Sequence, residues 1–75
     1  MPYPREVLNR LRWSGGGLEG VLVTYAHRGA PGDVVTVRGE DIMELGRSFF
    51  RTERSSVPYH RILRIERRGE VVFRA

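Results

Sequence analysis

The strongest constraint on the fold is a change of hydrophobic period at the glycine run Gly15 to Gly17. Before this run, Val7, Leu8 and Leu11 fall on one face of a helix, which predicts an amphipathic helix over residues 4–13. Three consecutive glycines favour neither helix nor strand, so the helix ends there. After them the apolar residues alternate with a period of two, which is typical of strands.

The alternating part of the chain predicts strands separated by short turns. The predicted strands cover residues 21–26, 34–37 and 44–52, with a brief helical turn at 41–43 before the third. Both faces of the first strand are apolar, so we expect it to be central, with the second paired back on it through the compact turn at 27–33. The segment 53–56 reads as another turn.

A hairpin is predicted at the end of the chain, with strands 63–67 and 70–74 joined by Arg68-Gly69. Pairing across such a two-residue turn places Ile65 opposite Val72, Arg64 opposite Phe73 and Arg67 opposite Glu70. The pattern predicts an α+β fold: one N-terminal helix packed on a small curled antiparallel sheet of four to five strands, barrel-like. A chain of 75 residues forms one domain, 1–75.

Composition excludes several classes of protein. The chain has no cysteine, so disulfides and thiolate metal sites are excluded and a cytoplasmic location is expected. Its longest apolar run, residues 20–26, is far shorter than the roughly 20 residues that a membrane span needs. We therefore expect no membrane association, and no cofactor or metal.

All 13 basic residues are arginine, and the formal net charge is +4. A guanidinium group matches a phosphate with two parallel hydrogen bonds and stacks on bases, so this composition favours nucleic acid as a partner. A genome rich in G and C gives the same composition without any such function. Charge therefore leaves the function open.

Two clusters of the same form could carry a function. Tyr25-Ala26-His27-Arg28 ends the first predicted strand, and Tyr59-His60-Arg61 follows Pro58 before the last hairpin. Each cluster offers an aromatic ring, an imidazole and a guanidinium beside a turn. If the clusters meet, they form one pocket with two imidazoles and two guanidiniums, which suits a phosphate group.

Structural explanations of the same residues stay open. Tyr25 continues an apolar face and can belong to the core, Pro58 can simply start a strand, and histidines at strand ends are common surface residues. Recognised catalytic motifs are absent: neither histidine is followed by the x-Ser or x-Thr of 2H phosphoesterases, and no nucleophile elbow or phosphate loop occurs.

Four segments of the chain, LNRLRW, YAHRGAPGD, GEDI…LGRSFF and VPYHRILRI…GEVVF, together resemble the small archaeal proteins grouped as the RNA cyclic group end recognition domain. The resemblance implies a non-enzymatic module that binds RNA ends bearing a 2′,3′-cyclic phosphate and works with RNA-processing enzymes such as ligases or 2H phosphoesterases. The candidate RNA- or phosphate-binding residues are Tyr25, His27, Arg28, Gly29, Pro58, Tyr59, His60, Arg61 and Arg64. The alternatives are a basic β-domain that coats nucleic acid generally, and a phosphoesterase that uses His27 and His60.

Overall fold

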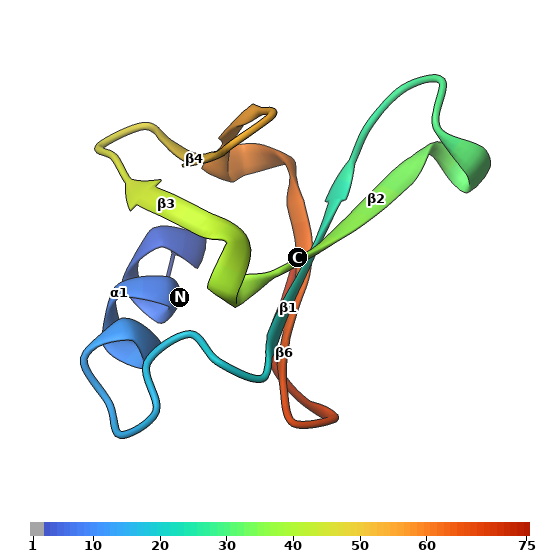
Figure 1. The fold of residues 1–75 in the computed structure, drawn as a ribbon. Helices are drawn as coiled ribbons and strands as arrows, with labels where there is room; N and C mark the ends of the chain where they lie inside the picture. The colour runs from blue at the N-terminus through green and yellow to red at the C-terminus, as the bar shows by residue number, and fades with distance from the viewer. Residues whose placement is uncertain (1–2) are drawn as a thin grey trace.

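The computed structural model describes residues 3–75, which form one α-helix, three 3-10 turns and seven strands in two antiparallel sheets (Figure 1). The elements are α1 (Pro4–Arg12), β1 (Val21–Ala26), η1 (Pro31–Asp33), β2 (Val34–Arg38), η2 (Gly39–Asp41), β3 (Ile42–Leu45), β4 (Phe49–Thr52), β5 (Ser56–Pro58), η3 (Tyr59–Arg61), β6 (Ile62–Arg67) and β7 (Glu70–Arg74). The predicted α+β class is confirmed. Within residues 3–75, no helix is both long and apolar enough to cross a membrane.

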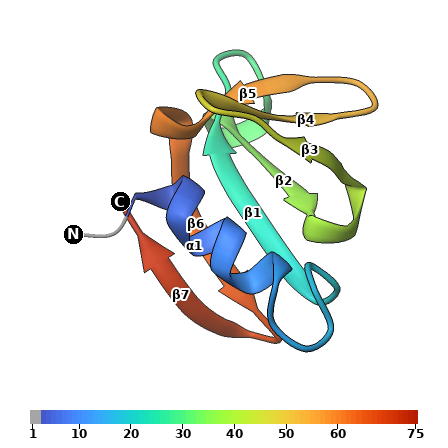
Figure 2. The same cartoon turned by 90° about the vertical axis from the view of Figure 1, so that its left-hand side faces the viewer.

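The N-terminal helix forms as predicted and covers one face of the larger sheet, as Figure 2 shows. Proline occupies its first turn, where the missing backbone N–H costs nothing. Val7, Leu8 and Leu11 point at the sheet and are buried. The glycines beyond it adopt positive φ, 88° at Gly16 and 58° at Gly17, and reverse the chain into the first strand.

The larger sheet has the order β2-β1-β6-β7, so the prediction that β1 is central and pairs with β2 is confirmed. Val23 pairs with Val37 on one side and with Ile65 on the other. Val23 and Ile65 are completely buried beneath the helix. The second sheet, β3-β4-β5, is contiguous in sequence and lies over one end of the first (Figure 2).

The prediction of one strand over 44–52 is wrong, because the chain reverses at Gly46 and makes the β3–β4 hairpin. The Gly46 N–H donates to the Phe49 carbonyl at 2.9 Å. A Cβ at position 46 would lie 2.8 Å from that same oxygen, so glycine is required by the close approach. The turn expected at 53–56 forms, closed by a hydrogen bond of 2.8 Å from the Thr52 N–H to the Ser55 carbonyl, and only its last residue, Ser56, belongs to β5. The helical turn expected at 41–43 lies earlier, at η2.

The last hairpin has the predicted turn but not the whole predicted register. Arg67 pairs with Glu70, and Arg68 and Gly69 both adopt positive φ, as a two-residue hairpin turn requires. Beyond the turn a bulge between Ile65 and Glu66 shifts the pairing, so Ile65 faces Phe73 instead of Val72, and Arg64 faces Arg74. The extra residue of a bulge leaves no sign in the alternation of apolar residues.

The two sheets are not closed into a barrel. The chain leaves the larger sheet at η2, builds the three-stranded sheet, and returns at η3 to start β6. Phe50 of β4 is fully buried in the common core and joins the two sheets. Two separate sheets therefore take the place of the single curled sheet that was expected. Figure 1 shows β2 and β3 diverging from each other.

Candidate functional site

The two Tyr-His-Arg clusters are connected through the core by a row of aromatic rings. The ring of Phe50 lies 6.1 Å from that of Tyr25 and 6.3 Å from that of Tyr59, measured between centroids. Tyr25 and Tyr59 are only 5% and 8% exposed. The tyrosines therefore anchor both clusters in the core, and neither ring is exposed to stack on a base.

The histidine of the first cluster and the arginine of the second line the same hollow, whose volume is about 180 Å³. Its walls are formed by Tyr25, His27, Ser55, Ser56, Val57, Pro58 and Arg61. We call this the His27–Arg61 hollow. It combines an imidazole, a guanidinium and two serine hydroxyl groups, which are all groups that can donate hydrogen bonds to an anion.

His27 is held in place by its neighbours. Its imidazole meets the edge of the Tyr25 ring, with 6.4 Å between centroids. Its backbone N–H donates to the Asp33 carbonyl at 2.8 Å, and its carbonyl accepts from Ala30 at 3.2 Å. Gly29, with a φ of 96°, donates to the Asp33 carboxylate at 3.2 Å, so the loop between β1 and β2 is internally bonded. A fixed loop of this kind reduces the ordering needed when a ligand binds.

Within residues 3–75, the side chains of His27, Arg28, His60 and Arg61 take part in no hydrogen bond or ion pair. All four are exposed. Three other arginines of residues 3–75, Arg38, Arg51 and Arg64, form ion pairs within the protein. Arg51 pairs with Glu44 at 2.9 Å, for example, and Arg64 pairs with Glu66 at 3.3 Å.

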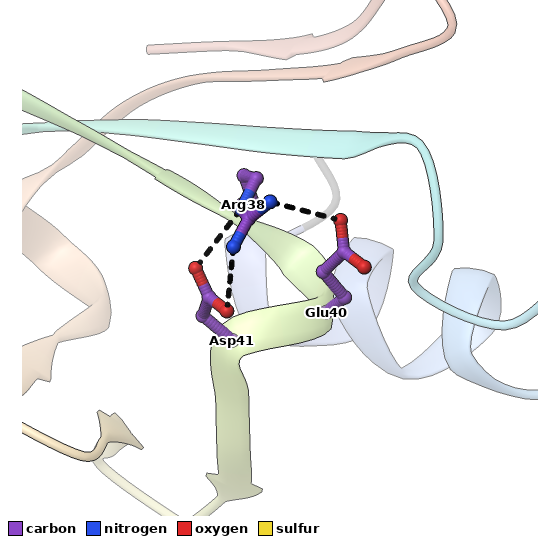
Figure 3. Close-up of polar contacts among 3 residues, drawn as sticks. All are labelled: Arg38, Glu40 and Asp41. Carbon is purple, nitrogen blue, oxygen red and sulfur yellow. Dashed lines mark hydrogen bonds and ion pairs between the residues drawn. The ribbon is translucent and has the colours of Figure 1, made fainter.

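Arg38 shows what a paired arginine looks like here (Figure 3). Its guanidinium donates to the Asp41 carboxylate at 3.2 and 3.4 Å and lies 3.7 Å from Glu40. The hydrogen bond to Asp41 and the charges of both carboxylates raise the pKa of Arg38. This triad ties the end of β2 to the η2 turn, and its charge is not available to a ligand. The contrast makes the unpartnered groups around the His27–Arg61 hollow the better candidates for binding.

A larger hollow of about 530 Å³ adjoins the first, since Tyr25 and Ser55 line both. It lies between β2 and the β3–β4–β5 sheet, where Figure 1 shows the two diverging. Val35, Val37 and Met43 give it apolar walls. Its polar lining consists of Thr52, Arg54, Ser55 and three carboxylates, Glu40, Asp41 and Glu53. We call it the inter-sheet hollow.

His60 does not line the His27–Arg61 hollow. It faces a separate hollow of about 360 Å³, lined by Tyr3, Pro4, Arg5, Glu6, Arg47, Ser48, Tyr59 and His60, which we call the His60–Arg47 hollow. The imidazoles of His27 and His60 thus line two separate hollows, whereas one pocket containing both was expected. The physical reason is η3: three residues in a tight turn direct neighbouring side chains to different sides.

Tyr59 lines the His60–Arg47 hollow, and its hydroxyl is hydrogen-bonded within the protein. It donates to the Gly46 carbonyl at 2.7 Å, and Arg5 Nε donates to the same oxygen at 3.0 Å. Burial raises the pKa of Tyr59, and the nearby Arg5 charge opposes the shift. The Tyr59 N–H also donates to the Ser48 carbonyl at 3.2 Å, so α1, the β3–β4 turn and η3 are fastened together at one point.

The other predicted residues have different places. Arg28 and Gly29 lie on the loop beside the His27–Arg61 hollow but do not line it, and Arg64 lines neither hollow and is paired with Glu66. Sequence reasoning missed Ser55 and Ser56, which it assigned to a turn. A serine pair directly before the VPYHR segment was the available signal. In the described part of the chain, no group of three histidine, aspartate or glutamate side chains could hold a metal ion.

The sequence matches the family model of the MJ1316 RNA cyclic group end recognition domain over residues 1–74. A UPF0248 protein of Methanococcus maripaludis strain C6 is 33% identical over 73 residues, covering 93% of this chain and 95% of that protein. UPF0248 proteins of Thermococcus kodakarensis and Pyrococcus abyssi are 35% and 36% identical, each covering 92% of this chain and 86% and 84% of their own lengths. No solved structure matches the chain. The match of the family model over nearly all 75 residues places this chain in the family of the MJ1316 RNA cyclic group end recognition domain.

Proposed function

We propose that this protein binds the phosphate-bearing ends of RNA, with the terminal phosphate in the His27–Arg61 hollow, and does not itself catalyse a reaction. One observation carries the proposal: His27 and Arg61 come from different clusters, line one hollow, and have no partner within residues 3–75. An unpartnered guanidinium beside hydroxyl groups is a receptor for a phosphate. The description of the family supports the choice of RNA ends.

The charge in the hollow favours a cyclic phosphate over an open one. A 2′,3′-cyclic phosphate carries a single negative charge, whereas an open terminal phosphate carries about 1.5 to 2 at neutral pH. The hollow has one permanent cation, Arg61, and further hydrogen-bond donors in His27, Ser55 and Ser56. The one guanidinium that lines the hollow balances a monoanion.

The inter-sheet hollow gives the terminal nucleoside a place. It adjoins the phosphate position and offers apolar walls from Val35, Val37 and Met43 for the ribose and base. Bases held in this way usually stack on aromatic rings or on guanidinium planes. Since Tyr25 is buried, Arg54 is the side chain there that provides a planar group.

The proposal is tested with three RNA oligonucleotides of one sequence that end in a 2′,3′-cyclic phosphate, a 3′-phosphate or a 3′-hydroxyl. Fluorescence anisotropy should give the highest affinity for the cyclic end. Arg61→Ala should cost about 1.5–3 kcal/mol on that end, because it removes a hydrogen bond to a charged group. His27→Ala should also reduce the preference for the cyclic end.

Arg10→Ala is the matched control, because Arg10 is exposed on α1 and lines none of the three hollows. It removes the same charge and should change affinity little. Arg54→Ala is not a neutral control, since Arg54 lines the inter-sheet hollow. Equal losses from Arg10→Ala and Arg61→Ala on all three ends would contradict end recognition and favour general coating of the nucleic acid backbone.

A further inference from the structure

The His60–Arg47 hollow lies outside the phosphate site described above and is the more spacious of the two, at about 360 Å³ against about 180 Å³. Its side chains come from three places in the chain: Tyr3 and Pro4 at the start of α1, Arg47 and Ser48 in the β3–β4 turn, and His60 in η3. No part of the proposed end recognition uses them.

The exposed groups of this hollow suit an unpaired nucleotide. Tyr3 is 72% exposed, so its ring is a free stacking surface, unlike the two buried tyrosines. Arg47 and His60 are exposed and make no hydrogen bond or ion pair within residues 3–75. Aromatic rings, guanidinium planes and a positive charge are the means by which proteins hold single-stranded RNA. Glu6 is the only carboxylate among the lining residues, so the cationic groups outnumber it.

The position of the hollow relates it to the phosphate site. Pro58 and Arg61 line the His27–Arg61 hollow, whereas Tyr59 and His60, between them in sequence, line the other. The segment 58–61 is therefore a shared wall, with one hollow on each side. A strand whose terminal phosphate lies at Arg61 therefore has the second hollow on the other side of this wall.

The shared wall is rigid. Tyr59 is fastened to the β3–β4 turn twice, through its hydroxyl to the Gly46 carbonyl at 2.7 Å and through its N–H to the Ser48 carbonyl at 3.2 Å. Arg5 Nε donates a third hydrogen bond at the same place, to the Gly46 carbonyl at 3.0 Å. Both hollows are thus held at a fixed separation before RNA arrives, which lowers the cost of ordering on binding.

We propose that the His60–Arg47 hollow is a second nucleotide subsite, which holds a base and phosphate of the same RNA strand upstream of the terminal phosphate. The upstream direction rests on the proposed function, which places the terminal phosphate in the His27–Arg61 hollow. Tyr3 and His60 stack on the base, and Arg47 binds the phosphate. The protein therefore recognises a single-stranded end of several nucleotides.

Three probes separate the two sites: a nucleoside 2′,3′-cyclic monophosphate, a tetranucleotide with a 2′,3′-cyclic phosphate, and the same tetranucleotide with a 3′-hydroxyl. Arg47→Ala and His60→Ala should each weaken both tetranucleotides about tenfold, the usual cost of a lost base stack or phosphate contact. Neither substitution should change the affinity for the cyclic mononucleotide. Arg61→Ala should weaken both cyclic ligands and spare the hydroxyl tetranucleotide.

Salt dependence gives a readout that a merely structural defect would not change. Loss of one phosphate contact should reduce the slope of log affinity against log salt by about 0.7 for Arg47→Ala. Arg10→Ala, matched in charge, should change neither the slope nor the dependence on length. Thermal melting should show that the Arg47→Ala and His60→Ala variants are folded, because these two side chains have no bonded partner within residues 3–75.

The outcomes are distinguishable. Arg47→Ala and His60→Ala variants that bind the tetranucleotides as tightly as the wild type, or lose the mononucleotide equally, would overturn the second subsite. Equal wild-type affinity for the cyclic and hydroxyl tetranucleotides would overturn end recognition alone. In that case a tenfold loss on the hydroxyl tetranucleotide would still support the second subsite.

Discussion

Tyr59 is the residue on which the arrangement of both hollows depends. Its ring packs against Phe50 in the core, its hydroxyl ends on the Gly46 carbonyl, and its backbone lies in the wall between the hollows. A tyrosine in a YHR cluster invites interpretation as a stacking platform. Burial gives it the opposite role, because the ring positions His60 and Arg61 while remaining hidden from any ligand.

Tyr59→Phe should lower the free energy of unfolding by about 1 kcal/mol at neutral pH, the usual net value of one hydrogen bond. The loss should not be larger, because Arg5 still donates to the Gly46 carbonyl and leaves it satisfied. Urea unfolding followed by circular dichroism measures it. Tyr3→Phe is the control, since Tyr3 is 72% exposed.

The same substitution should change the dependence of stability on alkaline pH. Burial raises the pKa of Tyr59 in the folded state, so above about pH 10 the tyrosine of the unfolded chain ionises first. Stability from this group is complete below that pH and is lost as the pH rises through the folded pKa. The Tyr59→Phe variant should therefore lose less stability than the wild type between pH 9 and 11. Parallel curves for the two proteins would show that Tyr59 makes no such contribution.

At the scale of elements, the η2 turn determines how the two sheets are placed. Gly39, buried within it, lies against the Leu18 carbonyl and Val21, and a Cβ there would be 2.5 Å from the oxygen and 2.8 Å from the Val21 Cβ. The Arg38 triad holds the same turn from the solvent side (Figure 3). The close approach of the backbone allows the chain to leave one sheet and start the other within three residues.

Gly39→Ala should destabilise the protein by about 1–3 kcal/mol, because the added methyl group meets backbone and a buried side chain that cannot move aside. Gly15→Ala is the matched control: nothing lies within 4 Å of the added atom. It should leave stability unchanged or slightly higher. Equal urea midpoints for the two variants would contradict the requirement for glycine at position 39.

Elements could be predicted from the sequence where one local signal decided them. The helical period and the glycine run predicted α1, and the alternation from Val21 predicted the central strand β1 with the bounds that the structure has. The reversal at Gly46 could not be distinguished from a weak point in a strand, because its cause is the approach of the Phe49 carbonyl. The register shift between β1 and β6 likewise depends on residues that are far apart in the chain.

At the scale of the whole molecule, the site was harder to predict than the fold. The repeated Tyr-His-Arg pattern drew attention to both clusters, and His27 of one and Arg61 of the other line one hollow. Which member of each cluster faces which hollow depends on the η3 turn, whose geometry only the folded chain shows. Arg47 had no pattern of its own, since it lines its hollow through tertiary contacts alone.

The separation of the hollows predicts that the protein does not cleave RNA. Acid-base cleavage by two histidines needs both imidazoles at one phosphate, and His27 and His60 line different hollows. End-labelled RNA with a 2′,3′-cyclic phosphate should stay intact during prolonged incubation, with or without divalent metal ions. Ring opening or scission by the wild type that is lost in the His27→Ala/His60→Ala double variant would establish an enzyme instead.

The order of the strands also has a consequence for folding. The three-stranded sheet uses neighbouring segments, so its contacts close short loops, whereas β1 and β6 pair across everything between residues 26 and 62. Closing such a loop is entropically the more costly step and slows folding. His27 and Arg61 are brought together by this pairing, so a chain that has stopped short of the native state does not form the His27–Arg61 hollow. If this hollow receives the phosphate as proposed, only molecules that have finished folding capture an RNA end.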